Sequence, residues 1–169
     1  MSRTVHVNEA YQTGYTYTAT EPAGRNFNPE FAPGLTPQQM LRAGVFGGNY
    51  FTVPPAEFPT VWFKGVKLST SGHAEAALNY FKVNASQPLA EWKRKGWIHP
   101  EDPQGWFLWY CRYYQGRRIS EEDIRQIKRW RNMRRHVTQL RKACPRGALS
   151  CHPRQRQALL HWAYDSRQL

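Results

Sequence analysis

The sequence contains no long hydrophobic run, which limits what the chain can be. The longest strongly apolar stretch covers residues 106–111 and ends at Arg112, whereas a membrane-spanning helix needs about twenty apolar residues. The first twenty residues are polar and include Arg3, His6 and Glu9, a composition that is not typical of a secretory signal. We therefore predict a soluble intracellular protein of the cytoplasm, nucleus or nucleoid, without a membrane partner.

Cysteine and acidic residues are also scarce. Three cysteines are too few for a disulfide framework, so in a reducing compartment we expect them to be thiols or metal ligands. Asp and Glu number only 12 against 24 Lys and Arg, which gives a formal net charge of +12. An excess of this size favours a polyanionic partner.

The positive charge is confined to one half of the chain. Residues 1–91 contain six basic and six acidic groups, whereas residues 92–169 contain eighteen basic and six acidic groups. The second half therefore carries the whole excess. Such segregation is typical of a binding face, although a solvated basic surface without a partner is the simpler alternative.

Helix start and stop signals predict the secondary structure. A capping box with proline at the first helical position begins at Thr36, and Gly44 ends that helix. Similar signals predict five more helices, which cover residues 71–82, 86–96 with Pro88 near its start, 102–116, a basic helix that begins at Ser120, and a last helix from Pro153. Residues 61–68 are predicted as a short strand, and Gly14–Thr20 as an edge strand or an extended arm.

These signals give a fold class and a domain division. We expect a mainly α protein, with a compact helical domain of about five to six helices and an irregular, partly extended N-terminal arm. The arm covers residues 1–34, and a single helical domain with a basic C-terminal half covers residues 35–169. The aromatic content of 14% argues against disorder throughout.

The basic helix after Ser120 is the first candidate for nucleic-acid binding. Ile124, Ile127, Trp130 and later apolar residues recur at three- and four-residue steps and form one face. The other positions hold mostly cations, from which we select Lys128, Arg131, Arg134 and Arg135. Such a helix can follow a phosphate backbone, lie on a membrane or bind an acidic protein. Flanking helices that can bury its apolar face favour nucleic acid.

The predicted helix over residues 102–116 is the second candidate because it is aromatic almost all round. Residues 106–114 hold six aromatic rings, and each base stacked on a ring contributes about 1–3 kcal/mol. We expect one face to line a partly wet pocket, formed by Trp106, Trp109, Tyr110 and Tyr113, whereas Phe107 belongs to the core. The nearby cations are Arg112, Arg117 and Arg118. A central core helix with satisfied hydroxyl groups is the alternative.

Two blocks of the sequence resemble segments of scattered uncharacterised proteins. The first is Gly105–Tyr114, with the sequence GWFLWYCRYY, followed by residues 116–118. The second is Arg154–Tyr164, with the sequence RQRQALLHWAY. The resemblance implies one shared domain and carries no known activity.

Three residues are candidates for catalysis. Glu75 follows His73 by two positions, the arrangement in which zinc-dependent nucleobase deaminases place a metal ligand and a proton-shuttling glutamate. Asp165 lies where a helix is expected to end, so it either pairs with an arginine or acts with His161 in a glycosylase-like reaction. The sequence does not decide whether the chain is an enzyme.

A structural zinc is the only cofactor for which the sequence offers ligands. The candidates flank a turn between two basic helices and are Cys144, Cys151, His136 and His161. Four cysteine or histidine ligands suit zinc, but their spacing matches no standard zinc finger. The alternatives are core thiols with surface imidazoles, or a reversible disulfide between the two cysteines.

Together these features favour a nucleic-acid-binding protein that prefers DNA slightly to RNA and uses a basic helix and an aromatic pocket. The first alternative is an enzyme acting on a nucleic-acid base, glycosylase-like rather than a zinc deaminase. The second is an interaction module for an acidic protein partner. The sequence indicates no oligomeric state.

Overall fold

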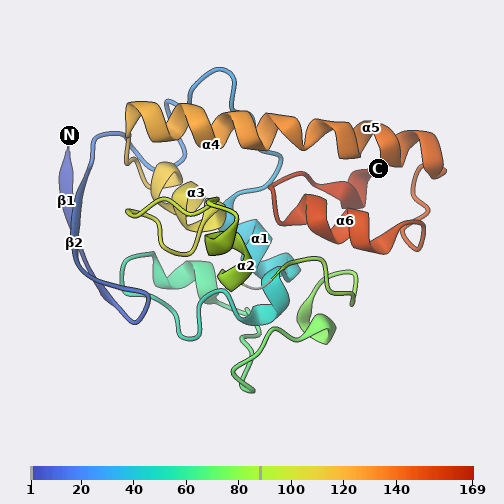
Figure 1. Ribbon diagram of the computed structural model, residues 1–169, viewed down its shortest axis with the longest axis horizontal. Helices are drawn as coiled ribbons and strands as arrows, with labels where there is room; N and C mark the ends of the chain where they lie inside the picture. The colour runs from blue at the N-terminus through green and yellow to red at the C-terminus, as the bar shows by residue number, and fades with distance from the viewer. Residues whose placement is uncertain (1, 88) are drawn as a thin grey trace.

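The computed structural model describes residues 2–87 and 89–169 (Figure 1). Its regular elements are β1 (Arg3–Glu9), β2 (Gln12–Ala19), α1 (Pro37–Ala43), α2 (Leu89–Arg94), α3 (Trp106–Tyr114), α4 (Ser120–Asn132), α5 (Arg134–Ala143) and α6 (Pro153–Leu160). Short 3-10 segments occupy Phe46–Gly48, Thr60–Phe63, Ala76–Leu78 and Ser166–Gln168. None of the described helices combines the length and the apolarity that crossing a membrane requires.

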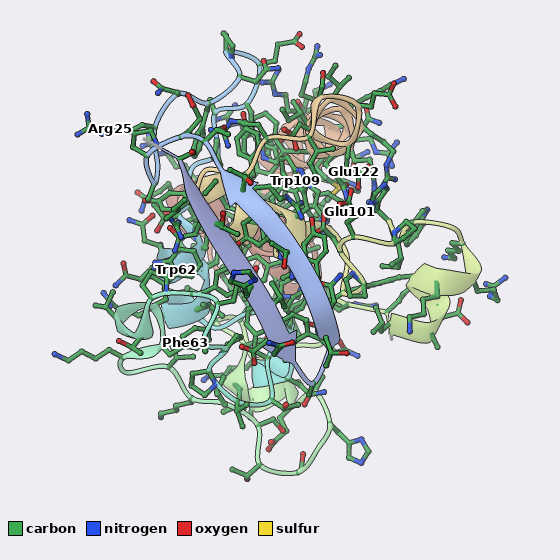
Figure 2. All side chains as sticks on the ribbon, turned by 90° about the vertical axis from the view of Figure 1, so that its left-hand side faces the viewer. Arg25, Trp62, Phe63, Glu101, Trp109 and Glu122 are labelled. Carbon is green, nitrogen blue, oxygen red and sulfur yellow. A yellow bond between two sulfur atoms is a disulfide. The ribbon has the colours of Figure 1, made fainter. Side chains whose placement is uncertain are left out.

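Residues 3–19 form a β-hairpin, so the prediction of an irregular arm is wrong for this part of residues 1–34. The alternative of a paired edge strand over Gly14–Thr20 is confirmed up to Ala19, where β2 ends. β1 and β2 pair antiparallel from Arg3 opposite Ala19 to Glu9 opposite Gln12. Alternation along β2 buries Tyr17 and Ala19 and exposes Thr16 and Thr18. An isolated hairpin is marginally stable in water, but this one lies across one face of the helical body (Figure 2).

The middle of the chain also contradicts the mainly α prediction. The helix predicted over residues 71–82 and the strand predicted over 61–68 are both absent, although both ranges are fully described. Loops there are held by tertiary contacts instead. The backbone N–H groups of Glu75 and Tyr80 donate to the carbonyl oxygens of Gly47 and Gly44. A Cβ at Gly47, where φ is +61°, would lie 2.5 Å from the Glu75 nitrogen, so only glycine permits this approach.

The helix signals elsewhere were more accurate. The capping box of α1 is confirmed, because Thr36 Oγ1 accepts a hydrogen bond from the Gln39 N–H at 3.1 Å, and the Gln39 side chain accepts from the Thr36 N–H at 2.8 Å. α2 covers only part of the range predicted from residue 86, and Pro88 lies outside the described residues. The predicted basic helix breaks at Met133 into α4 and α5, which run nearly in line (Figure 1).

α3 lies at the centre of the core. Every residue from Trp106 to Tyr113 is buried, and aromatic rings from distant loops and helices surround it. Phe31 packs edge-on against Trp130 of α4 with ring centroids 5.0 Å apart, and Trp130 stacks on Tyr164 at 5.1 Å. A smaller cluster of Leu140, Cys144 and Leu159 joins α5 to α6.

Candidate functional site: an aromatic cleft beside a basic helix

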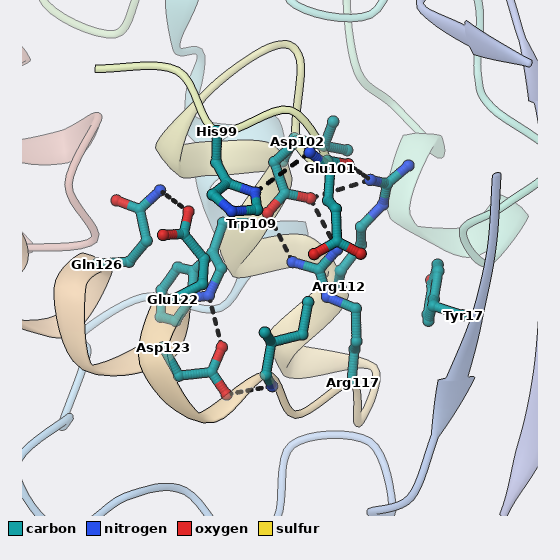
Figure 3. Close-up of polar contacts among 12 residues, drawn as sticks. Tyr17, His99, Glu101, Asp102, Trp109, Arg112, Arg117, Glu122, Asp123 and Gln126 are labelled. Carbon is teal, nitrogen blue, oxygen red and sulfur yellow. Dashed lines mark hydrogen bonds and ion pairs between the residues drawn. The ribbon is translucent and has the colours of Figure 1, made fainter. Parts of the chain in front are cut away.

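Two arginines predicted to bind nucleic acid lie instead in a buried ion network. Arg112 Nε is 2.6 Å from Glu57 Oε1, and its Nη1 is 2.9 Å from Asp102 Oδ1. Arg117 Nη2 is 2.6 Å from Asp102 Oδ2. Figure 3 shows Asp102 between the two guanidinium groups. These side chains are at most 2% exposed, so their charges are neutralised inside the fold and do not face a ligand.

The same network fixes the hairpin to α3. The hydroxyl groups of Tyr11 and Tyr17 donate to the two oxygens of Glu57 at 2.9 and 3.0 Å. Burial and the Glu57 carboxylate raise the pKa of both tyrosines, so both stay protonated donors at neutral pH. Arg112 also donates to the Gln12 side chain at 2.7 Å. The carboxylate is therefore fully satisfied by structural partners.

Three of the four residues on the predicted pocket face of α3 are core, namely Trp109, Tyr110 and Tyr113, so the expectation of a partly wet pocket is wrong for them. The fourth, Trp106, lines a cleft that is described below. Trp109 Nε1 donates to Asp123 Oδ1 at 2.8 Å, and the Tyr110 hydroxyl donates to the Leu35 carbonyl at 2.6 Å. The Tyr113 hydroxyl accepts from the Asn28 N–H at 2.7 Å. None of the three predicted base-stacking residues is more than 2% exposed. Phe107 is buried as expected.

Arg118 also has structural partners. Its guanidinium lies 3.8 Å from the ring centroid of Tyr113 and donates to the carbonyl of the same residue at 2.7 Å. A second nitrogen donates to the carbonyl oxygens of Arg25 and Asn26 at 3.1 and 3.2 Å. Arg118 therefore fastens the loop after β2 to the end of α3.

The cations of α4 and α5 that were predicted to contact phosphate remain on the surface. Lys128, Arg134 and Arg135 are exposed, as predicted for contact with phosphate. Arg131 is 45% exposed and pairs with Glu30 at 3.0 Å. Further exposed cations extend the same surface along α5 and into the next loop: Arg141, Lys142 and Arg146.

The structure does not assemble the predicted zinc ligands. Cys144 and Cys151 form a disulfide, which was one of the alternatives. Among the described residues, the one group of metal-ligating side chains adds His152 to them, not His136 or His161. His136 contacts Gln155, and Cys111 is a buried thiol. In this oxidised form both sulfur atoms are already bonded, so zinc binding stays a prediction for the reduced chain.

Two of the predicted catalytic carboxylates have local partners. Glu75 accepts from the Ser69 hydroxyl at 2.7 Å and lies in a loop, whereas a deaminase glutamate would follow its histidine into a helix. Asp165 pairs with Arg167 at 2.7 Å. Burial raises the pKa of Asp165, but the contacts with Arg167 outweigh it and lower the pKa overall. Of the two roles expected for Asp165, pairing with an arginine is therefore the arrangement that the structure contains.

A concave surface between α2, α4, α6 and the start of α3 forms a cleft, which we call the aromatic cleft. Its volume is about 430 Å³, within the range of small-ligand sites. Its walls include Phe46, Tyr50, Ser86, Trp92, Trp97, Trp106, Phe107, Arg129, Arg154, His161 and Trp162. Figure 2 shows the segment that carries α2 extending from the body of the molecule.

Arg129 is the charged group of the aromatic cleft. Its Nη1 donates to the Trp97 carbonyl at 3.2 Å and to the Gln126 side chain at 3.0 Å, and its guanidinium lies 5.3 Å from the Trp162 ring. It forms no ion pair with any described residue. Burial, with the nearby charge of Arg125, lowers the pKa of Arg129 to about 10. It therefore stays a cation at neutral pH without a counter-ion.

A second chamber adjoins the aromatic cleft. It has a volume of about 520 Å³ and shares with the cleft the side chains of Phe46, Tyr50, Ser86, Gln87 and Trp92. Its other walls carry the side-chain amides of Asn49, Asn79, Asn84 and Gln104. We call it the amide chamber. The two spaces meet at Ser86 and Phe46. The backbone of Phe46 is in the left-handed region, with a φ of +56°.

Sequence reasoning identified His161 and placed Trp106 on a pocket-lining face, but it missed most of the cleft. Trp92 and Trp97 lie in a segment with only one short helix, and the cleft forms when this segment approaches α6 from a distant part of the chain. Arg129 looked like one of many cations on a solvated face. The signal that could have found it is its position beside Trp130 and one helical turn before Met133.

Comparison of the chain with protein-family models, with curated proteins and with solved structures returns no match. The resemblance of the two sequence blocks to uncharacterised proteins therefore stays a prediction. What the cleft binds has to be argued from its own chemistry.

Proposed function

We propose that the protein binds nucleic acid by taking one unstacked base into the aromatic cleft while the exposed cations of α4 and α5 contact the phosphate backbone. The observation that carries the proposal is the position of Arg129. It places a partly buried, unpaired guanidinium inside a cleft walled by tryptophans. A planar ring that carries a phosphate satisfies both features at once, because aromatic walls stack bases and guanidinium groups bind phosphate.

The charge of the cleft argues against other ligands of similar size. Aromatic cages that bind ammonium groups attract a cation, whereas the described walls of this cleft hold Arg129 and Arg154 and no carboxylate. A purely apolar ligand would leave Arg129 buried without a counter-ion, which is costly. An anionic ligand with an aromatic ring fits better than either.

The geometry favours a single strand or a flipped base. A base in a duplex is stacked on both sides and must leave the helix before it can enter a cleft of this size. The proposal also includes the slight preference for DNA over RNA that we predicted from the sequence. Binding is proposed in place of base removal, because a glycosylase needs a carboxylate or polarised water near the base and the described cleft walls offer no Asp or Glu.

Arg129 provides the sharpest test. We expect Arg129→Gln to weaken binding of a fluorescent single-stranded DNA about 10- to 100-fold, since a hydrogen bond to a charged group contributes about 1.5–3 kcal/mol. Arg125→Gln is the matched control, because Arg125 lies on the same helix and pairs with Glu122 at 2.6 Å. Fluorescence anisotropy measures both. Equal effects of the two variants would remove the cleft from the proposal.

The backbone contacts are tested separately by salt. Replacing Lys128, Arg134 and Arg135 by Gln should make the slope of log K against log salt shallower by about one unit per lost phosphate contact. A control variant removes three exposed cations elsewhere, namely Arg42, Lys64 and Lys67, and should leave the slope nearly unchanged. Heparin that competes as well as single-stranded DNA and RNA would favour a generic polyanion site or an acidic protein partner.

A further inference from the structure

Ser86 lies at the junction of the aromatic cleft and the amide chamber and lines both. Its Oγ is 2.8 Å from His161 Nδ1. A serine beside a histidine can be an activated nucleophile or a simple hydrogen-bonding group, and the two roles need opposite proton positions. The hydrogen bonds behind His161 decide between them.

The first step is the orientation of Gln157. Its Oε1 accepts from the Phe81 N–H at 2.9 Å, and its Nε2 donates to the Gly44 carbonyl at 3.0 Å. A backbone N–H can only donate and a carbonyl can only accept, so the amide of Gln157 has one allowed orientation. Its second Nε2 hydrogen points to His161 Nε2 at 3.0 Å.

The position of the proton on His161 follows from the two groups that face its Nε2. Its Nε2 lies 3.1 Å from the Phe46 N–H and 3.0 Å from the Gln157 amide nitrogen, and both of these groups donate. Nε2 is therefore the unprotonated nitrogen. The imidazole is 4% exposed, and burial lowers its pKa to about 3, so the ring is neutral and carries its single hydrogen on Nδ1.

The protonation of His161 determines the role of the Ser86 hydroxyl group. Because His161 Nδ1–H donates to Ser86 Oγ, the imidazole cannot accept the serine proton, and Ser86 is not an activated nucleophile. Its hydroxyl hydrogen has no acceptor among the described residues. The hydroxyl group is thus fixed as a donor at the wall of both spaces.

We propose that Ser86 is a specificity-determining donor that recognises an acceptor atom on the edge of the bound base. This inference rests on the proposed function of the cleft. Two buried acceptors in the amide chamber lack a donor among the described residues, Gln104 Oε1 and Asn49 Oδ1. The Gln104 amide is oriented by its Nε2, which donates to the Tyr50 carbonyl at 2.7 Å. A ligand edge with one acceptor and one N–H group, as nucleobases have, complements these groups.

The test compares natural bases with analogues of the same shape that cannot form hydrogen bonds. One single-stranded DNA set carries thymine or difluorotoluene at one position, and a second carries adenine or methylindole. Wild-type protein should bind at least one natural base about 3- to 10-fold more tightly than its analogue, the effect of one hydrogen bond. Ser86→Ala should discriminate less than wild type between the natural base and its analogue, because only the contact with Gln104 Oε1 remains. Ser71→Ala, at an exposed serine outside the cleft, should behave as wild type.

The outcomes separate this inference from the function on which it rests. Equal binding of both natural bases and their analogues by wild-type protein, with a loss in Arg129→Gln, would overturn base recognition by Ser86 and leave nucleic-acid binding in place. Wild-type protein that binds no strand would overturn both. A second measurement needs no ligand: nitrogen-15 NMR of His161 should show a protonated Nδ1 and an unprotonated Nε2. The opposite tautomer would make Ser86 a donor to His161 and overturn the inference.

Discussion

Arg112 and Glu57 form an ion pair in which neither side chain is exposed, with Nε and Oε1 2.6 Å apart. Arg112 belongs to the aromatic block of α3, and Glu57 lies in a loop 55 residues earlier. The pair therefore joins two segments that are far apart in the sequence. It also shows why a cation in a basic half of the chain does not have to bind a partner.

Removal of the Glu57 carboxylate should be strongly destabilising. Glu57→Ala leaves the Arg112 guanidinium buried without one of its two carboxylates and leaves two tyrosine hydroxyls without an acceptor. The expected loss in the free energy of unfolding is about 3–5 kcal/mol, measured by chemical denaturation. The control is Glu91→Ala, because Glu91 pairs with Arg94 on the surface and should cost less than about 1 kcal/mol. Similar losses in both variants would contradict a structural role for the buried pair.

Tyr113 should behave as a core residue. The Tyr113 side chain is 2% exposed and contacts the rings of Phe27, Phe31 and Trp109. Tyr113→Ala should lower the free energy of unfolding by about 3–5 kcal/mol, as large aromatic truncations do, and Phe107→Ala should cost a similar amount. Nucleic-acid binding by the folded fraction of Tyr113→Ala should be unchanged, because Tyr113 does not line the aromatic cleft. If Tyr113→Ala keeps normal stability but loses binding, the result would support the pocket that the sequence predicted on this face of α3.

The elements with strong local signals were predictable from the sequence. Thr36 and Gln39 form their capping box, Ser120 begins α4 and Pro153 begins α6, because each signal acts within one helical turn. The turns around Gly47 were not predictable in this way. They depend on hydrogen bonds between residues 44–48 and 69–80, to which no short-range pattern points.

The site was harder to predict than the fold. Charge counting located the cations, but it could not separate Arg112, which has a buried carboxylate partner, from Lys128, which is exposed. Aromatic counting chose α3, most of whose rings are core, and passed over Trp92 and Trp97, which line the cleft. Ion pairing and side-chain burial are properties of the tertiary structure, so these distinctions could not be made from the sequence alone.

The disulfide should contribute to stability through the link between α5 and α6. Cys144 and Cys151 are seven residues apart, and closing a loop of this length stabilises a fold by about 2–3 kcal/mol in the chain-entropy description. The double variant Cys144→Ser with Cys151→Ser should lose that amount in chemical denaturation. Cys111→Ser serves as the comparison for a buried thiol outside the bridge. Reduction of the wild-type protein should match the double variant unless a metal replaces the bond, and metal analysis after reduction checks this.

His161 should make the fold less stable as the pH falls below neutrality. Burial lowers the pKa of His161 from its ordinary value of 6.5 to about 3. Between these values the unfolded chain takes up a proton that the folded protein does not, so the stability due to the neutral ring is complete above pH 6.5 and is lost progressively toward pH 3. Between pH 6.5 and pH 5 this loss is about 2 kcal/mol, because one pKa unit corresponds to 1.36 kcal/mol.

The measurement is the free energy of unfolding at pH 7.5 and pH 5 for wild-type protein and for His161→Gln. The variant loses absolute stability at both values, since Phe46 N–H and Ser86 lose a fitted partner, but the difference between the two pH values should shrink by about 2 kcal/mol. His73→Gln is the control because His73 is exposed, and it should keep the wild-type difference. An equal pH dependence in wild type and His161→Gln would mean that the ring takes up its proton in the folded state. The neutral Nδ1–H tautomer that orients Ser86 would then not be the state present at mildly acidic pH.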